Sequence, residues 1–204
     1  MAAQPRTGMS IEEYLAFERA STEKHEYRDG EMVAMVGASY RHNTIVGNVF
    51  ASLRTRLRDG SCRVNFSDLR VQIPGERFYT YPDLTVICGQ PRFSDDHQDT
   101  LLNPQIIIEV LLPSTQGYDH GDQGYDHGEK FRHYRGIESL REYVLIEQDI
   151  RRIEHFVRQA NDLWLLADMT GPNATLVLPT IDCAIPFAEI YEEVVFAAPD
   201  DSDA

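Results

Sequence analysis

A single carboxylate interrupts the most apolar run of the chain. Glu109 stands in the sequence Ile-Ile-Ile-Glu-Val-Leu-Leu over residues 106–112, a run that predicts a strand covered on both faces. Burying an unpaired carboxylate costs several kcal/mol, so Glu109 needs a cation, a proton or a metal beside it. Glu109 is therefore the first candidate for a residue that does chemistry.

Other residues could share a site with Glu109. Asp83 opens another strand-like run, and Lys130 begins a helical segment downstream. Carboxylates on neighbouring strands suit Mg²⁺ or Mn²⁺, and the backbone carbonyl of Val110 supplies a third oxygen. A lysine beside such a site orients an attacking water or stabilises charge on a phosphate. The set predicts a phosphodiesterase site, with Glu26 as a further acid that helps at a second metal or orients water.

Short strands interleaved with a few helices must position these residues. Ser10 and Glu13 fit a capping box, and Asp29-Gly30 between two strand-like runs indicates a hairpin. Helices are predicted at about 10–20, 39–58, 131–135 and 187–193. Strands are predicted at 62–66, 69–73, 81–88, 105–111, 142–148, 152–158, 162–169 and 174–185. The alternation predicts an α/β or α+β sandwich.

Length and composition favour one globular domain. The 204 residues are 42% hydrophobic and 25% charged, which is typical of a folded protein. We expect a disordered tail at 1–8, one domain over 9–196 and an acidic tail over 197–204. No stretch approaches the roughly 18 apolar residues that cross a bilayer, and the start contains no secretory core. A cytoplasmic protein with no membrane partner is expected.

Three cysteines lie far apart in the sequence. They are Cys62, Cys88 and Cys183, and none belongs to a CxxC pair. An odd number of cysteines in a reducing compartment predicts neither a disulfide nor a zinc scaffold.

The chain is strongly acidic. It carries 33 Asp and Glu against 19 Lys and Arg, a formal charge of −14. This balance argues against charge-driven binding to nucleic acid or to an anionic membrane. Any binding to DNA is therefore expected to be weak, metal-dependent and salt-sensitive.

A seven-residue unit is duplicated ahead of Lys130. Residues 117–123 read Gly-Tyr-Asp-His-Gly-Asp-Gln, and residues 124–130 read Gly-Tyr-Asp-His-Gly-Glu-Lys. Two copies are too few for a repeat fold, so a duplicated loop at 116–129 is the simplest interpretation. Its histidines and aspartates suggest zinc or nickel, but glycine-rich flanks give such ligands no rigid support.

Each candidate also has a purely structural interpretation. Glu109 would be a core acid paired with Arg70 or Arg63, and Lys130 a surface residue paired with Asp126 one helical turn away. His42, on the apolar face of the 39–58 helix, is by default a satisfied histidine near a helix end; facing the site is the alternative.

Several blocks of sequence occur in a fixed order that resembles a known family. They are His25-Glu26-Tyr27, Asp29-Gly30-Glu31, Tyr81-Pro82-Asp83, the stretch Ile107 to Thr115, and Asp126-xxx-Lys130-xxx-Tyr134. Together they resemble the Uma-two family of restriction-endonuclease-like proteins, a branch of the PD-(D/E)XK nuclease superfamily. The resemblance runs from about Met9 to Val195.

The resemblance implies a restriction-endonuclease-like mixed β-sheet flanked by helices, with a divalent-metal site on the sheet. By position, Asp83 and Glu109 match the acidic residues, Lys130 the downstream lysine and Glu26 an N-terminal acid. The implied function is a Mg²⁺- or Mn²⁺-dependent DNA endonuclease in which Asp83, Glu109 and Val110 bind the metal and Lys130 assists water attack. Duplex cleavage needs two sites, which favours a homodimer.

Two departures support an alternative function. The superfamily places lysine two positions after the acid, where this chain has Leu111, and family members usually have serine where Leu112 stands. The duplication also adds seven residues between Glu109 and Lys130. The alternative is a catalytically inactive nuclease-fold module for binding or assembly. A phosphoesterase acting on nucleotides or RNA is a third, weaker hypothesis.

Overall fold

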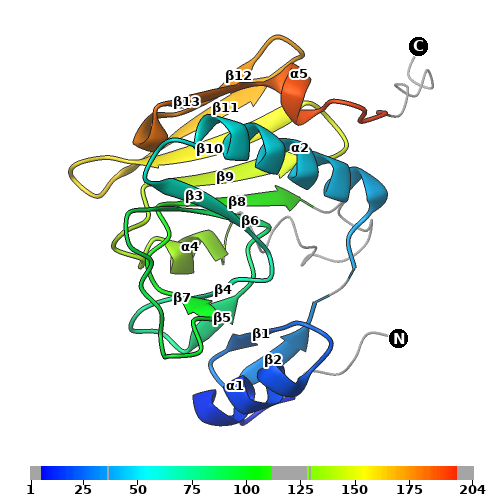
Figure 1. Cartoon of the computed structure of the whole chain (residues 1–204). Helices are drawn as coiled ribbons and strands as arrows, with labels where there is room; N and C mark the ends of the chain where they lie inside the picture. Colours follow the sequence, from blue (N-terminus) through cyan, green and yellow to red (C-terminus); the bar gives the residue numbers. More distant parts are fainter. Residues whose placement is uncertain (1–5, 36, 112–127, 129, 197–204) are drawn as a thin grey trace.

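A six-stranded mixed sheet forms the centre of the fold (Figure 1), in the order β11-β10-β9-β8-β6-β3. The computed structural model describes residues 6–35, 37–111, 128 and 130–196. The strands of this sheet are β3 Cys62–Phe66, β6 Leu84–Cys88, β8 Ile106–Leu111, β9 Glu142–Glu147, β10 Arg152–Arg158 and β11 Trp164–Thr170. Strands β8 and β9 are parallel, and the other neighbours are antiparallel. The expected mixed sheet is confirmed.

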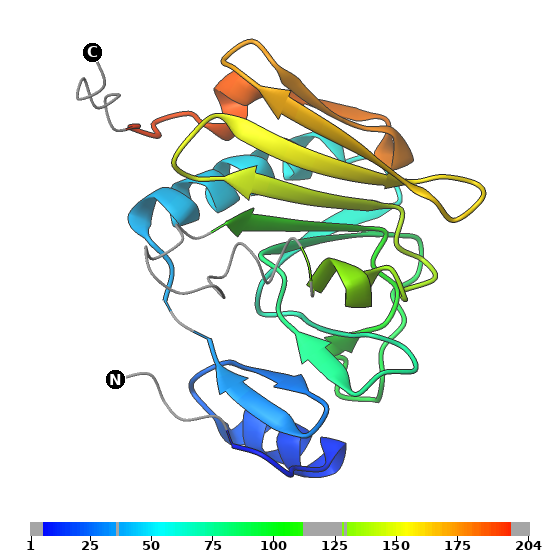
Figure 2. The ribbon, with the colours of Figure 1, turned by 180° about the vertical axis from the view of Figure 1, so that it is seen from behind.

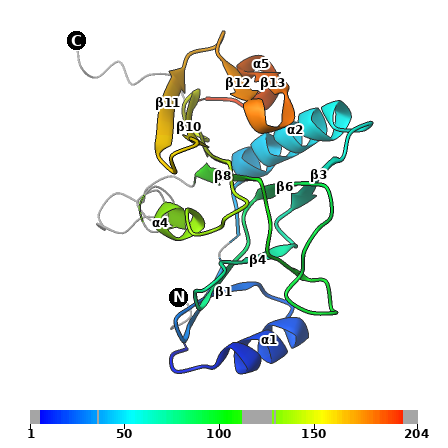
Figure 3. The same cartoon turned by 90° about the vertical axis from the view of Figure 1, so that its left-hand side faces the viewer.

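One face of this sheet is covered by a long helix and a hairpin. The covering elements are α2 Tyr40–Arg56, β12 Thr175–Leu178, the 3-10 turn η2 Pro179–Ile181, β13 Cys183–Pro186 and α5 Phe187–Ile190. Ile45, Val49 and Leu53 recur with the helical period and are fully buried against the strands. The 17-residue helix α2 therefore lies fixed across the sheet, as Figure 3 shows from the side.

The opposite face carries α4 and a second, smaller sheet. Helix α4 Phe131–Tyr134 lies in front of the central sheet when the molecule is seen from behind (Figure 2). The second sheet has the order β2-β1-β5-β4-β7. Its strands are β1 His25–Arg28, β2 Glu31–Ala34, β4 Arg70–Gln72, β5 Phe78–Thr80 and β7 Thr100–Leu101. Strand β8, buried at every position, is thus enclosed between these layers.

The N-terminal elements follow local sequence signals. Helix α1 Ile11–Ala20 begins at Ser10, whose side chain and that of Glu13 form the reciprocal capping box. The β1–β2 hairpin turns at Asp29 and Gly30, with φ of 44° and 94°, the positive values that a two-residue type I′ turn requires. Arg6, within the expected N-terminal tail, forms a bridge with Met32 of β2.

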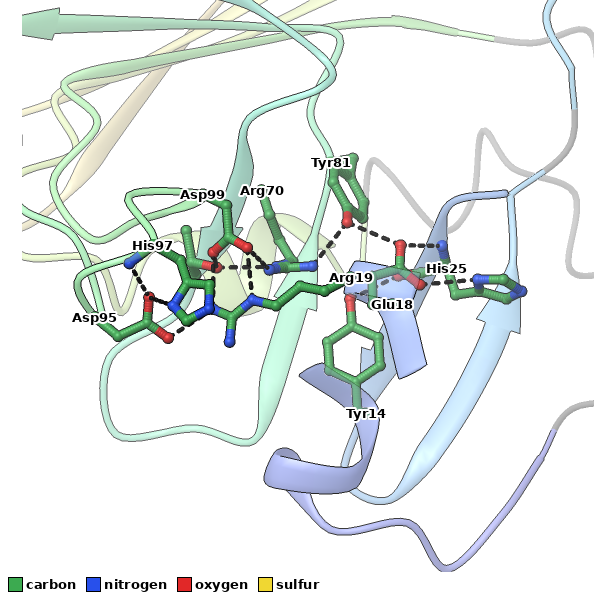
Figure 4. Close-up of polar contacts among 10 residues, drawn as sticks. Tyr14, Glu18, Arg19, His25, Arg70, Tyr81, Asp95, His97 and Asp99 are labelled. Atoms are coloured by element: carbon green, nitrogen blue, oxygen red, sulfur yellow. Dashed lines mark hydrogen bonds and ion pairs between the residues drawn. The ribbon is translucent and has the colours of Figure 1, made fainter. Parts of the chain in front are cut away.

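A buried polar network attaches α1 and β1 to the rest of the molecule (Figure 4). Glu18 of α1 accepts hydrogen bonds from the backbone and the ring of His25, at 2.8 and 2.9 Å, and from the Tyr81 hydroxyl at 2.8 Å. Arg70 of β4 donates to the same hydroxyl and lies 3.1 Å from Asp99. These hydrogen bonds therefore hold strand β1, which contains Glu26, against the core.

The same network continues to the surface through Arg19. Its guanidinium binds Asp95 at 2.6 Å and Asp99 at 2.7 Å. The hydrogen bond from Arg19 holds the pKa of the Asp99 carboxyl well below its usual range. The ion pairs of Arg19 therefore connect the loop before β7 to α1.

The prediction of no disulfide was wrong. Cys62 of β3 and Cys88 of β6 are direct partners in the antiparallel register, with Cα atoms 3.9 Å apart, and their Sγ atoms are bonded. The two cysteines are 26 residues apart in the sequence. This spacing does not predict a disulfide, because the pairing depends on which strands become neighbours in the sheet. Cys183 is free and buried.

Some element boundaries also differ from the sequence-based expectation. The run predicted as one strand over 174–185 is two strands separated by η2, because Pro179 lacks an amide hydrogen and cannot continue the ladder. Strand β6 begins at Leu84, after Pro82. Strands β5 and β7 were not predicted. Most of the duplicated unit, residues 117–127 and 129, lies outside the described residues. Within the described part of the chain no helix is long and apolar enough to cross a membrane.

Leu53 provides a test of the packing between α2 and the sheet. We expect Leu53→Ala to lower the free energy of unfolding by about 2–5 kcal/mol, because truncating the fully buried side chain leaves a cavity. Urea unfolding measures the change. Leu165→Ala is the matched control, since that side chain is 61% exposed and should cost less than about 0.5 kcal/mol. Equal losses in the two variants would contradict the packing described.

Candidate metal and phosphodiester site

Asp83 and Glu109 lie side by side on neighbouring strands. Leu84 of β6 pairs with Ile108 of β8, so the residues next to them, Asp83 and Glu109, face each other. The backbone amide of Asp83 donates to Glu109 Oε2 at 3.1 Å, and the amide of Val110 donates to Asp83 Oδ2 at 2.8 Å. Each carboxylate is therefore fixed by the backbone of the other strand.

Lys130 supplies the cation that the buried Glu109 requires. Its side chain is itself buried, with the residue 7% exposed, immediately before α4. Lys130 Nζ lies 3.3 Å from Glu109 Oε1 and 3.3 Å from Glu26 Oε1. The surface role considered for Lys130 is therefore wrong, and the structure brings together all four predicted site residues.

The arginines considered as partners of Glu109 serve elsewhere. Arg70 binds Tyr81 and Asp99 in the N-terminal network. Arg63 donates to the backbone carbonyls of Gly60 and Cys62. Neither arginine is therefore the partner of Glu109, which contacts Lys130 instead.

Tyr134 and Thr80 complete the enclosure of the carboxylates, and sequence reasoning had assigned neither a role. The Tyr134 hydroxyl donates to Glu109 Oε1 at 3.0 Å, and Thr80 Oγ1 donates to Glu26 Oε1. Burial, with the charge of Glu109, raises the pKa of Tyr134 well above its usual value, so the phenol stays protonated. The sequence signal that could have identified Tyr134 is its position one helical turn after Lys130, in the motif that carries the family resemblance.

His42 also reaches the site. It lies in the first turn of α2, which Ser39 caps through the His42 amide, and the residue is 7% exposed. Its Nε2 atom lies 3.1 Å from Asp83 Oδ2. The alternative role considered from the sequence, a histidine facing the site, is the one observed.

The donor set suits a hard divalent cation. Lys130 contacts Glu26 and Glu109, and Asp83 lies beside Glu109, so three carboxylates gather with one ammonium group and their formal charges leave the cluster net negative. Within the described ranges, no group of three or more His, Cys, Asp or Glu side chains is arranged so that together they could hold a metal ion. Mg²⁺ and Mn²⁺ do not need such a cage, because they bind through one or two carboxylates and keep several waters.

The backbone of Val110 fits the same role. In an extended strand the N–H and C=O of one residue point to the same edge. The Val110 N–H points to Asp83, so its carbonyl faces the same side. The residues present are therefore compatible with a cation held by Asp83, Glu109 and the Val110 carbonyl.

Two relatives of the chain come from Synechocystis sp. The "Uncharacterized protein sll1609" is 36% identical over 168 residues, covering 82% of this chain and 91% of that protein. The "Uncharacterized protein slr1290" of the same organism is 33% identical over 194 residues, covering 94% of this chain and 96% of that protein. The similarity to both proteins therefore extends over most of the domain.

A solved structure shares the fold. It is a crystal structure from Anabaena variabilis, described as "a putative nuclease belonging to DUF820", and it superimposes with a TM-score of 0.69 at 14% identity. The match covers 92% of this chain and all of the other. At this identity the similarity establishes the α+β architecture.

The family itself is established by sequence. The profile of the Uma2 family, described as "Putative restriction endonuclease", matches residues 11–187. That range contains every site residue named above and nearly all of the described domain. The chain therefore belongs to the Uma2 family of restriction-endonuclease-like proteins.

Proposed function

We propose that the protein is a Mg²⁺- or Mn²⁺-dependent DNA endonuclease. The observation that carries the proposal is the buried cluster in which Asp83 and Glu109 are fixed side by side and Lys130 Nζ lies 3.3 Å from Glu109. A negative cluster with one internal lysine can bind a divalent cation and also stabilise charge on a phosphate, as metal-dependent phosphodiester hydrolysis does. Membership of the Uma2 family supports the same reaction class.

In this proposal Asp83, Glu109 and the Val110 carbonyl hold the cation. The bound cation would polarise a phosphodiester oxygen and lower the pKa of a coordinated water. Lys130 would orient the attacking water and stabilise negative charge on the phosphate, while Glu26 and Glu109 keep its ammonium group in place. Hydrolysis adds the water oxygen to phosphorus and breaks one P–O ester bond, and the leaving oxygen takes up a proton.

DNA is the proposed substrate, and a second copy of the chain would supply the second cut in a duplex. The formal charge of −14 makes the bulk surface repel a polyanion. Binding is therefore expected only where a cation neutralises the site, and it should be weak and sensitive to salt.

The two acidic residues give the first test of this function. We expect purified protein with Mg²⁺ or Mn²⁺ to nick supercoiled plasmid. Asp83→Asn and Glu109→Gln should each lower the rate by at least about 100-fold, because each removes a negatively charged ligand. Asp162→Asn, at an exposed carboxylate that pairs with Arg158, is the matched control and should cleave normally.

Calorimetric titration with Mn²⁺ separates the enzyme from the inactive binding or assembly module. If the wild type binds Mn²⁺ no more tightly than about 1 mM, and Glu109→Gln gives the same titration, the module is favoured. Cleavage that persists in both site variants would contradict the assignment of Asp83 and Glu109.

Lys130 gives an independent test of the catalytic step. We expect Lys130→Gln to lower the nicking rate by about 100- to 1000-fold, because it removes a positive charge that acts on the phosphate. Mn²⁺ binding should persist, since both carboxylate ligands remain. Lys24→Gln is the control, because that lysine pairs with the exposed Asp68 and not with Glu26 or Glu109. A Lys130→Gln protein that is folded, binds Mn²⁺ and cleaves at the wild-type rate would exclude this role.

A further inference from the structure

We propose that His42 is a positioning residue that holds Asp83 in the orientation that binds a cation. The inference rests on the proposed cation site and extends it to a helix on the other side of the sheet from Lys130. The observation that supports this proposal is the contact of 3.1 Å between His42 Nε2 and Asp83 Oδ2.

The two oxygens of Asp83 have different surroundings. Oδ2 accepts two hydrogen bonds, from the Val110 amide at 2.8 Å and from His42 Nε2 at 3.1 Å. Oδ1 has no hydrogen-bond partner among the residues that the structure describes. Two donors from different elements fix the rotation of the carboxylate, which leaves Oδ1 as its open ligand atom.

The contact also fixes the tautomer of His42. An ionised carboxylate only accepts hydrogen bonds, so Nε2 must carry the hydrogen and donate it to Asp83. Nδ1 is buried and has no hydrogen-bond partner in the described structure. In the neutral ring with hydrogen on Nε2, Nδ1 is an unfilled acceptor, which is less costly than a buried N–H without a partner.

Core packing alone does not explain a histidine at this position. The neighbours of His42 on the buried face of α2 are Ile45 and Val49, and both are fully buried. An apolar side chain would fill this position without leaving a buried nitrogen unpaired, a cost of about 1–3 kcal/mol. The imidazole therefore contributes through its other nitrogen, which reaches Asp83. Groups that orient a ligand in this way commonly change metal affinity 10- to 100-fold when they are lost.

The test compares Mn²⁺ affinity in variants that keep or lose the Nε2 donor. The substitution His42→Gln would place an amide nitrogen near the position of Nε2, whereas His42→Leu leaves no donor there. We expect His42→Leu to weaken Mn²⁺ binding about 10- to 100-fold by calorimetry, and His42→Gln to retain most of the wild-type affinity. His97→Leu is the control, because the His97 side chain is 63% exposed and faces Asp95.

Thermal unfolding without metal separates positioning from structure. Similar unfolding temperatures for the His42→Gln and His42→Leu variants, together with different Mn²⁺ affinities, support positioning. In the metal-free wild type, ¹H–¹⁵N NMR of the imidazole should show the hydrogen on Nε2, and hydrogen on Nδ1 alone would overturn the proposal. If the wild type binds Mn²⁺, Asp83→Asn abolishes this binding and His42→Leu leaves it unchanged, the role of His42 is overturned and the cation site is not. A wild type that binds no Mn²⁺ would overturn the proposed function as well.

Discussion

The structure depends on one buried carboxylate and the cation that neutralises it. Glu109 is 4% exposed in the middle of a strand that is otherwise apolar on both faces. Without a partner such a charge would cost several kcal/mol. Lys130, Tyr134 and the Asp83 amide all direct hydrogens at its oxygens. Contacts from two other segments therefore offset the cost of burying Glu109 in this strand.

The surrounding elements position the residues that gather around Glu109, each in a different way. The antiparallel pairing of β6 with β8 brings Asp83 beside Glu109, and α4 begins where Lys130 reaches them. Strand β1 brings Glu26 from the second sheet, and the network around Glu18 holds that strand against the core. Helix α2 contributes His42 from the opposite face. The site thus joins both sheets and both helical layers.

The sequence predicts those features that depend on local signals. The cap at Ser10, the turn at Asp29-Gly30 and the apolar period of α2 each involve residues a few positions apart. Glu109 was recognisable because a charge in an apolar run is unusual. The Cys62–Cys88 bond depends on which distant strands become neighbours, so no local signal revealed it. Tyr134 stood in the motif that carries the family resemblance, but its contact with Glu109 depends on where α4 lies against the sheet.

A double-mutant cycle on Glu109 and Lys130 measures how strongly these two buried charges stabilise each other. The measured quantity is the free energy of unfolding of wild type, Glu109→Gln, Lys130→Gln and the double variant. If the two buried charges compensate each other, each single change removes one partner of this pair, and in Glu109→Gln the lysine keeps its contact with Glu26. The double variant then loses less than the two single losses together. We predict a coupling energy of about 1–3 kcal/mol. Additive losses, with a coupling near zero, would contradict the account.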